Sequence, residues 1–85
     1  MIYNVLVFKR SESGKETLQS IAPSFRTKQN AIDHALSYTL EDGYYLSNII
    51  GENDPVTEVW LMKENRRHIF GKEGLTIYIV ETELY

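Results

Sequence analysis

The chain has 85 residues, enough for one domain with a single small hydrophobic core, since independent domains usually run to about 100 residues or more. Its hydrophobic content of 42% and charged content of 25% are ordinary for a folded protein and exclude a disordered or collagen-like chain. The formal net charge of −3 is too small for a protein that coats DNA or mimics an acidic polymer.

The absence of cysteine excludes disulfides, a thiolate nucleophile and cysteine-based zinc or iron–sulfur sites. The apolar runs are much shorter than the roughly 18 residues that a membrane span needs. Residues 1–4 lack the basic start of a signal peptide. These observations predict a cytoplasmic protein that folds as one domain over residues 1–85, without a metal or cofactor.

The first part of the chain predicts a β-hairpin. Residues 2–8 are rich in β-branched and aromatic types at both alternating positions, which is typical of a central strand buried on two faces. Residues 11–16 contain Ser13-Gly14 and predict the turn. Residues 17–25 predict a returning strand, and Pro23 places it at a sheet edge because proline has no N–H to donate.

Residues 27–43 give the clearest periodic signal and predict an amphipathic helix of about four turns. Thr27 is the expected N-cap, and Gly43 occupies the position where a left-handed residue ends a helix. The predicted apolar stripe consists of Ile32, Ala35, Leu36, Thr39 and Leu40.

The remaining sequence predicts an antiparallel meander. Strands are expected at residues 44–50, 56–63, 66–70 and 75–82, joined by a loop at 51–55 and by turns at 64–65 and 71–74. The fold class is therefore α+β, with one antiparallel sheet of four to six strands in the order β-β-α-β-β-β and a single helix on one face.

A single helix is too narrow to cover such a sheet. Strands about 4.8 Å apart make a sheet roughly 20 Å wide or more, whereas one helix covers about 10–12 Å. If the turns at 64–65 and 72–73 are tight, Trp60 opposes Ile69 and Phe70 opposes Leu75. The aliphatic face toward the helix is then Val59, Leu61, His68, Phe70, Leu75, Ile77 and Ile79.

The opposite face carries residue types that are common at the centres of protein interfaces. Its members are Trp60, Met62, Arg67, Ile69, Thr76, Tyr78 and Val80. We expect Trp60, Met62, Arg67 and Tyr78 to bind another protein or a second copy of the chain, forming a homodimer. In the alternative interpretation, the N-terminal hairpin or residues 44–55 fold over this face and hide it.

Residues 41–58 carry five acidic side chains and no basic ones. This segment is a second candidate contact, which would dock on a basic groove of a nucleic-acid-handling partner. A solvated loop is the alternative. The candidate residues are Glu41, Asp42, Tyr44, Tyr45, Glu52 and Asp54.

A competing hypothesis is single-stranded nucleic-acid binding, in which bases stack on sheet aromatics and cations follow the phosphates. Its cations lie in residues 63–72 and are Lys63, Arg66, Arg67 and Lys72. Neither an RNP1 signature nor a second helix supports an RNA-recognition domain.

Catalysis has little support in the sequence, which contains no nucleophile elbow, P-loop, dinucleotide fingerprint or HExxH motif. His34 is expected on the polar side of the helix, and His68 at the edge of the core, without a carboxylate that the sequence places beside it. The chain is therefore expected not to be an enzyme.

In size and layout alone, the chain resembles small phage or mobile-element accessory proteins, including inhibitors of bacterial defence complexes. The resemblance covers the architecture and no residue pattern. It implies a small protein-binding module that acts as an inhibitor or accessory protein.

Overall fold

The computed structural model describes residues 1–63 and 73–83. These residues form five strands and one helix, and the class and element order predicted from the sequence are confirmed. The elements are β1 (Ile2–Arg10), β2 (Glu16–Phe25), α1 (Lys28–Glu41), β3 (Tyr44–Ile50), β4 (Val56–Lys63) and β5 (Gly74–Thr82).

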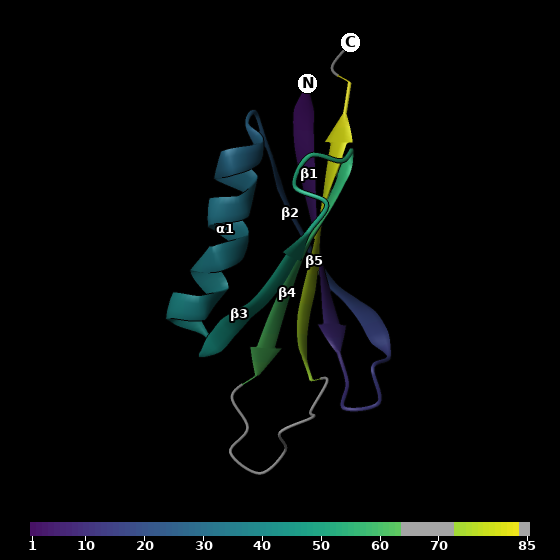
Figure 1. Cartoon of the computed structure of the whole chain (residues 1–85), viewed down its shortest axis with the longest axis vertical. Helices are drawn as coiled ribbons and strands as arrows, with labels where there is room; N and C mark the ends of the chain where they lie inside the picture. The colour runs from purple at the N-terminus through teal and green to yellow at the C-terminus, as the bar shows by residue number, and fades with distance from the viewer. Residues whose placement is uncertain (64–72, 84–85) are drawn as a thin grey trace.

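All strand pairs are antiparallel, in the spatial order β2-β1-β5-β4-β3. The β1–β2 hairpin and the β3–β4–β5 meander are joined by pairing between β1 and β5 in the middle of the sheet. The edge position predicted for the second strand is confirmed. Since α1 connects the two edge strands β2 and β3, the chain crosses one face of the sheet, as Figure 1 shows.

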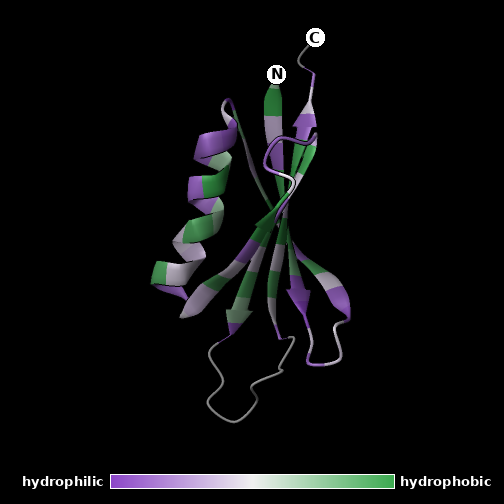
Figure 2. Cartoon of the chain, viewed as in Figure 1, coloured by the Kyte–Doolittle hydropathy of each residue, from purple (hydrophilic) through white to green (hydrophobic). Residues whose placement is uncertain are grey.

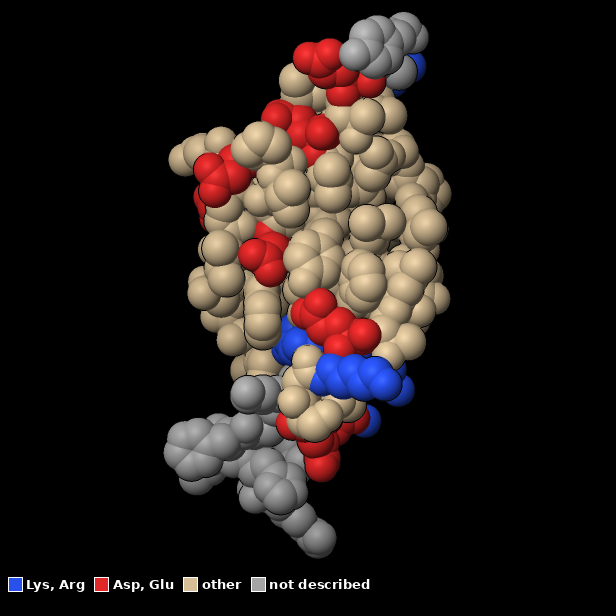
Figure 3. Space-filling view, turned by 90° about the vertical axis from the view of Figure 1, so that its right-hand side faces the viewer, with Lys and Arg blue, Asp and Glu red and all other residues tan. Residues whose placement is uncertain are grey.

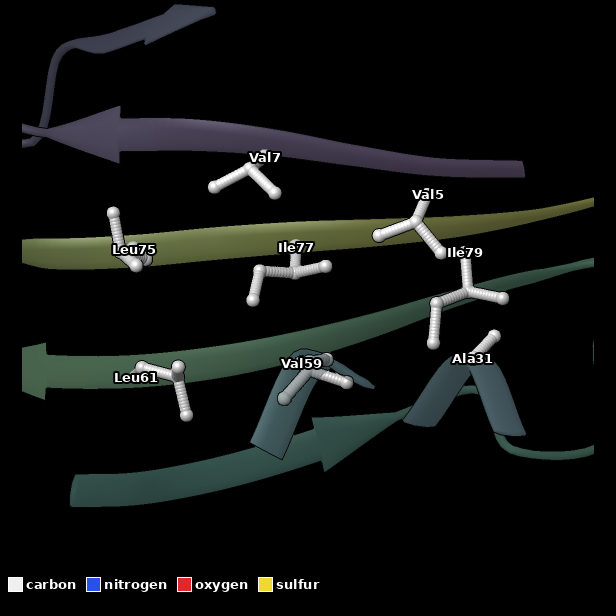
Figure 4. Close-up of a cluster of buried hydrophobic side chains, with 9 residues drawn as sticks. Val5, Val7, Ala31, Val59, Leu61, Leu75, Ile77 and Ile79 are labelled. Atoms are coloured by element: carbon white, nitrogen blue, oxygen red, sulfur yellow. The ribbon is translucent and has the colours of Figure 1, made fainter. Parts of the chain in front are cut away.

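The hydrophobic core lies between α1 and the sheet. Alternate residues of the three central strands project toward the helix and are fully or almost fully buried, and the close-up in Figure 4 shows how they lie together. On the helix, hydrophilic and hydrophobic segments alternate along the axis (Figure 2). The core members are Val5, Val7, Ala31, Ala35, Val59, Leu61, Leu75, Ile77 and Ile79.

Both predicted ends of the helix are confirmed. The Thr27 side chain accepts a hydrogen bond of 3.1 Å from the backbone N–H of Asn30, which makes it the N-cap. After the C-cap, Gly43 has a φ of +74°, a conformation that glycine adopts without steric cost. Lys28 lies at the unfavourable positive end of the helix, but its Nζ donates to the carbonyl oxygens of Glu52 and Asp54 at 2.8 and 3.0 Å.

The predicted apolar stripe of the helix is confirmed at Ala35, Ile32 and Leu36, but it wrongly included Leu40 and missed Ala31. Ala31 and Ala35 are the buried positions, whereas Leu40 is 90% exposed. The small alanine side chains face the sheet most directly, and the larger side chains of Ile32, Leu36 and Tyr38 pack partly buried around them against the core. His34 is half-buried, and its ring centroid lies 5.2 Å from that of Phe25.

The predicted strand at 66–70 lies outside the described residues. The register proposed for it is wrong, because β4 pairs directly with β5. Trp60 therefore opposes Thr76 rather than Ile69, and the partner of Leu75 on β4 is Leu61. The assignment of β4 and β5 residues to the two faces is unaffected.

The prediction that the first strand is buried on two faces holds for one face only. β1 is central, and Val5 and Val7 are fully buried on the helix side. Leu6 and Phe8, which point to the other side, are half-buried. No described element lies over them.

Candidate functional site

The candidate site is the sheet face that points away from α1, called the open face below. Its residues follow from the alternation of side chains along each strand and from the strand register. They include Asn4, Leu6, Phe8, Arg10, Glu16, Leu18, Ile21, Tyr45, Asn48, Ile50, Val56, Glu58, Trp60, Met62, Thr76, Tyr78 and Val80.

The open face exposes large apolar side chains on both of its edges. Ile21 on β2 is 67% exposed, and Tyr45 on β3 is 51% exposed. Figure 3 views the molecule from the side away from α1 and shows a broad uncharged surface with scattered acidic groups, and with basic groups beside acidic ones in its lower part. The hairpin and β3, which could have folded over this face, are instead part of the sheet.

Arg10 anchors one end of the open face and is only 2% exposed. Its guanidinium donates hydrogen bonds to the carbonyl oxygens of Leu61 and Leu75 at 2.8 and 2.7 Å, and to Thr76 Oγ1 at 2.6 Å. Burial lowers the pKa of Arg10, while the nearby Glu16 carboxylate acts in the opposite direction. The hydrogen bonds of the buried guanidinium therefore link β1 to β4 and β5 within the fold.

Gly74 creates the space that Arg10 occupies. It lies opposite Arg10 on β5, and a Cβ added there would stand 2.8 Å from Arg10 Nη2 and 2.0 Å from the Leu61 carbonyl oxygen. Any side chain at this position therefore requires the guanidinium and the β4 backbone to move.

Trp60 is held in place by Arg10, whose guanidinium carbon lies 4.4 Å from the indole ring centroid. The indole Nε1 is buried and has no hydrogen-bond partner in the described part of the chain. Packing and the cation–π contact therefore fix the ring. Beside it is a pocket of about 290 Å³ lined by Arg10, Ser13, Gly14, Glu16, Trp60 and Met62.

Tyr78 lies near the middle of the open face. Its hydroxyl donates a 2.9 Å hydrogen bond to Glu16 Oε2, and its ring makes an edge-to-face contact with Phe8 at 5.2 Å between centroids. Burial, the bond to Glu16 and the charges of Glu16 and Glu58 raise the pKa of Tyr78 to about 12. Two carboxylates therefore act on one phenol in an otherwise apolar surface.

Glu58 is surrounded by apolar and aromatic side chains. Val56 and Trp60 flank it along β4, Tyr78 opposes it on β5, and Ile50 opposes it on β3. Glu58 is half-buried, and its carboxylate takes part in no hydrogen bond or ion pair with any residue that the structure describes. It is an uncompensated negative charge within an apolar patch.

Three of the four face residues predicted from the sequence lie together. Trp60, Met62 and Tyr78 are on the open face, and Met62 Sδ lies 3.1 Å from Arg10 Nη2. Arg67 lies outside the described residues.

The structure does not gather the predicted acidic segment at one place. Glu41 and Asp42 lie at the end of α1, and Glu52 and Asp54 lie in the β3–β4 loop, with the seven residues of β3 between the two pairs. The two tyrosines diverge as well, since Tyr45 is on the open face and Tyr44 packs against the core.

The basic residues of the nucleic-acid hypothesis are mostly beyond the described part of the chain. Lys63 ends β4 and makes an ion pair of 3.4 Å with Glu73. Arg66, Arg67 and Lys72 lie outside the described residues, as does His68.

Sequence reasoning missed Arg10, Glu16 and Glu58 as parts of the face. The alternation of β4 places Glu58 on the same side as Trp60, so this signal was available in the sequence. The position of Arg10 depends on the register between β1 and β5, which join distant parts of the chain, and no local pattern reveals it.

Comparison with protein-family models, curated proteins and solved structures gave no match to this chain. Within residues 1–63 and 73–83, no helix is long and apolar enough to cross a membrane. The same residues contain no group of three or more His, Asp or Glu side chains placed to hold a metal ion.

Proposed function

We propose that this chain is a non-catalytic protein-binding module that docks its open face on another protein. The observation that carries the proposal is the apolar face that extends over all five strands and that no described element covers. Exposed apolar surface of this extent is typical of interaction sites.

The size of the face is adequate for a modest interface. Five strands span about 19 Å, and strands of nine residues are about 30 Å long, which gives roughly 600 Å² of face. Specific interfaces bury about 800 Å² on each partner. The open face alone is therefore close to the low end of this class, which is typical of reversible binding.

Preorganisation of the central aromatics also supports binding. Arg10 fixes Trp60, and the Glu16 hydrogen bond together with Phe8 fixes Tyr78. Aromatic rings that are already ordered lose little rotamer freedom when a partner covers them.

The charges of the described face disfavour the nucleic-acid alternative. A phosphate backbone lying across it would meet the carboxylates of Glu16 and Glu58, and the face's own cation, Arg10, is buried and bonded internally. Titration of Trp60 fluorescence with single-stranded oligonucleotides tests this alternative, and quenching that weakens with added salt would favour it.

An inhibitor or accessory role of the phage or mobile-element type remains part of the proposal. A small module with one binding face acts by occupying a surface that its target needs. Self-association into a homodimer through the same face is the competing outcome.

Site-specific photo-crosslinking in the source cell tests the proposal. A photoreactive phenylalanine analogue replaces Ile21 on the open face, and the same analogue replaces the exposed Asn30 on α1 as the matched control. We expect one discrete protein adduct from position 21 and none of that species from position 30.

The protein identified in the adduct is then purified, and its affinity for the chain is measured. Val56→Asp on the open face is expected to weaken the affinity of the chain for this protein at least about tenfold. Asn30→Asp on the helix is expected to leave that affinity unchanged. Equal adducts from positions 21 and 30, or no adduct from position 21, would contradict the proposal.

A further inference from the structure

The isolated carboxylate of Glu58 constrains what can cover the open face. It stands between exposed Val56 and half-buried Trp60, with Tyr78 and Ile50 on its two sides and no bonded partner among the described residues. Water solvates this charge in the free protein. A partner that seals the face removes that water.

Removing water from an ionised carboxylate is strongly unfavourable unless the charge is paired and hydrogen-bonded. If a purely apolar partner surface covered Glu58, this cost would offset much of the favourable free energy of burying Val56 and Ile50. Covering the face is favourable only if the partner brings a cation to this point.

We infer that the partner of the open face is a protein surface that presents apolar side chains around a lysine or arginine, and that this cation pairs with Glu58. The inference rests on the proposed function and adds the chemistry of the partner. Glu16, hydrogen-bonded to Tyr78, places a second carboxylate toward the same part of the face, where the charge of Arg10 opposes it.

A second copy of the chain fits this site poorly. Two copies packed face to face would bring two Glu58 and two Glu16 side chains into one interface. Each Arg10 is nearly inaccessible and already donates to the Leu61 and Leu75 carbonyls of its own subunit. Among the open-face residues named above, Arg10 is the one cation, so a second copy would add two carboxylates without an accessible cation from that set to pair with them.

Three synthetic amphipathic helical peptides test the inference. All share a leucine face, and their polar positions are lysine, glutamine or glutamate. Titration calorimetry gives the affinity, and backbone amide NMR shifts show where each peptide binds. The protein variants are Glu58→Gln, Glu58→Lys and the matched control Glu41→Gln, which removes one carboxylate from the end of α1 instead of from the face.

We expect the lysine peptide to shift open-face amides and to bind at least about fivefold more tightly than the glutamine peptide. Glu58→Gln should remove this preference, and Glu58→Lys should reverse it in favour of the glutamate peptide. Glu41→Gln should leave it unchanged. Thermal unfolding of each variant establishes that the fold is intact.

Three results would overturn the inference: equal binding of the lysine and glutamine peptides, an unchanged preference in Glu58→Gln, or a stable dimer in sedimentation that protects the open face. If all peptides bind the open face equally and Ile21 still yields its adduct, the partner chemistry is wrong while the proposed function stands. If the peptides shift no open-face amides and position 21 yields no adduct, both fail.

Discussion

The two faces of the sheet are built from the same strands but differ in what lies over them. On β4, Val59 and Leu61 are fully buried under α1, while Glu58 and Trp60, one residue away along the chain, are only half-buried. Alternation decides which face a residue joins, and the second layer decides whether that face is core or surface. Apolar composition alone cannot distinguish the two.

The largest expected difference between the faces is in stability. Ile77→Ala on the covered face removes a fully buried side chain and should lower the free energy of unfolding by about 2–5 kcal/mol. The matched change Ile21→Ala, at a residue that is 67% exposed, should cost less than about 0.5 kcal/mol. Urea unfolding followed by circular dichroism measures both, and equal losses would mean that the open face is covered in solution.

Arg10, like its hydrogen-bond partner Thr76, is buried although it belongs to the open face. Arg10→Met leaves the carbonyl oxygens of Leu61 and Leu75 without their donor and should cost about 2–3 kcal/mol in unfolding free energy. Lys9→Met, a change of the exposed neighbouring cation, should cost less than about 0.5 kcal/mol. If both variants lost a similarly small amount of unfolding free energy, Arg10 would not anchor the strands as described.

The helix that covers the other face of the sheet is stabilised by its N-cap. Thr27→Ala removes the side-chain oxygen that caps the Asn30 N–H and should cost about 1 kcal/mol. Thr39→Ala, within α1, should be neutral or slightly stabilising, because alanine is the better helix former. The thermal midpoints of the two variants, measured side by side, check the difference.

The smallest effect is electrostatic and lies on the open face. The pKa of Tyr78 is raised from 10.0 to about 12, which favours the neutral phenol in the folded state. This contribution to stability is complete below about pH 10 and is lost as the pH rises through about 12. A tyrosine absorbance titration should therefore lose its highest-pH component in Tyr78→Phe.

Glu16→Gln should lower the pKa of Tyr78, since the carboxylate both accepts its hydrogen bond and repels the phenolate. Glu12→Gln, an exposed acid in the β1–β2 turn, is the control and should leave it unchanged. An unchanged titration in Glu16→Gln would show that the hydrogen bond does not form in solution.

Local sequence signals predicted the elements well. The bounds of β3 and β4, the Thr27 cap and the left-handed Gly43 all depend on residues close together in the chain, and they are confirmed. The side-chain alternation of β4 also placed Trp60 and Met62 together on the face away from the helix.

Features that depend on distant contacts were not predictable in this way. The pairing of β1 with β5 joins the two ends of the described chain, and it alone places Gly74 opposite Arg10. Likewise, the small residue Ala31 is buried while Leu40 is exposed, because the surface that the helix meets decides which of its residues are covered.

The pairing of β1 with β5 also has a consequence for synthesis on the ribosome. β5 lies between β1 and β4, so the centre of the sheet is missing until the last described strand has been translated. Until then the hairpin and the β3–β4 pair remain separate, and the edges of β1 and β4 that β5 will pair with stay open. We therefore expect late, cooperative folding and a nascent chain that is vulnerable to aggregation until β5 emerges.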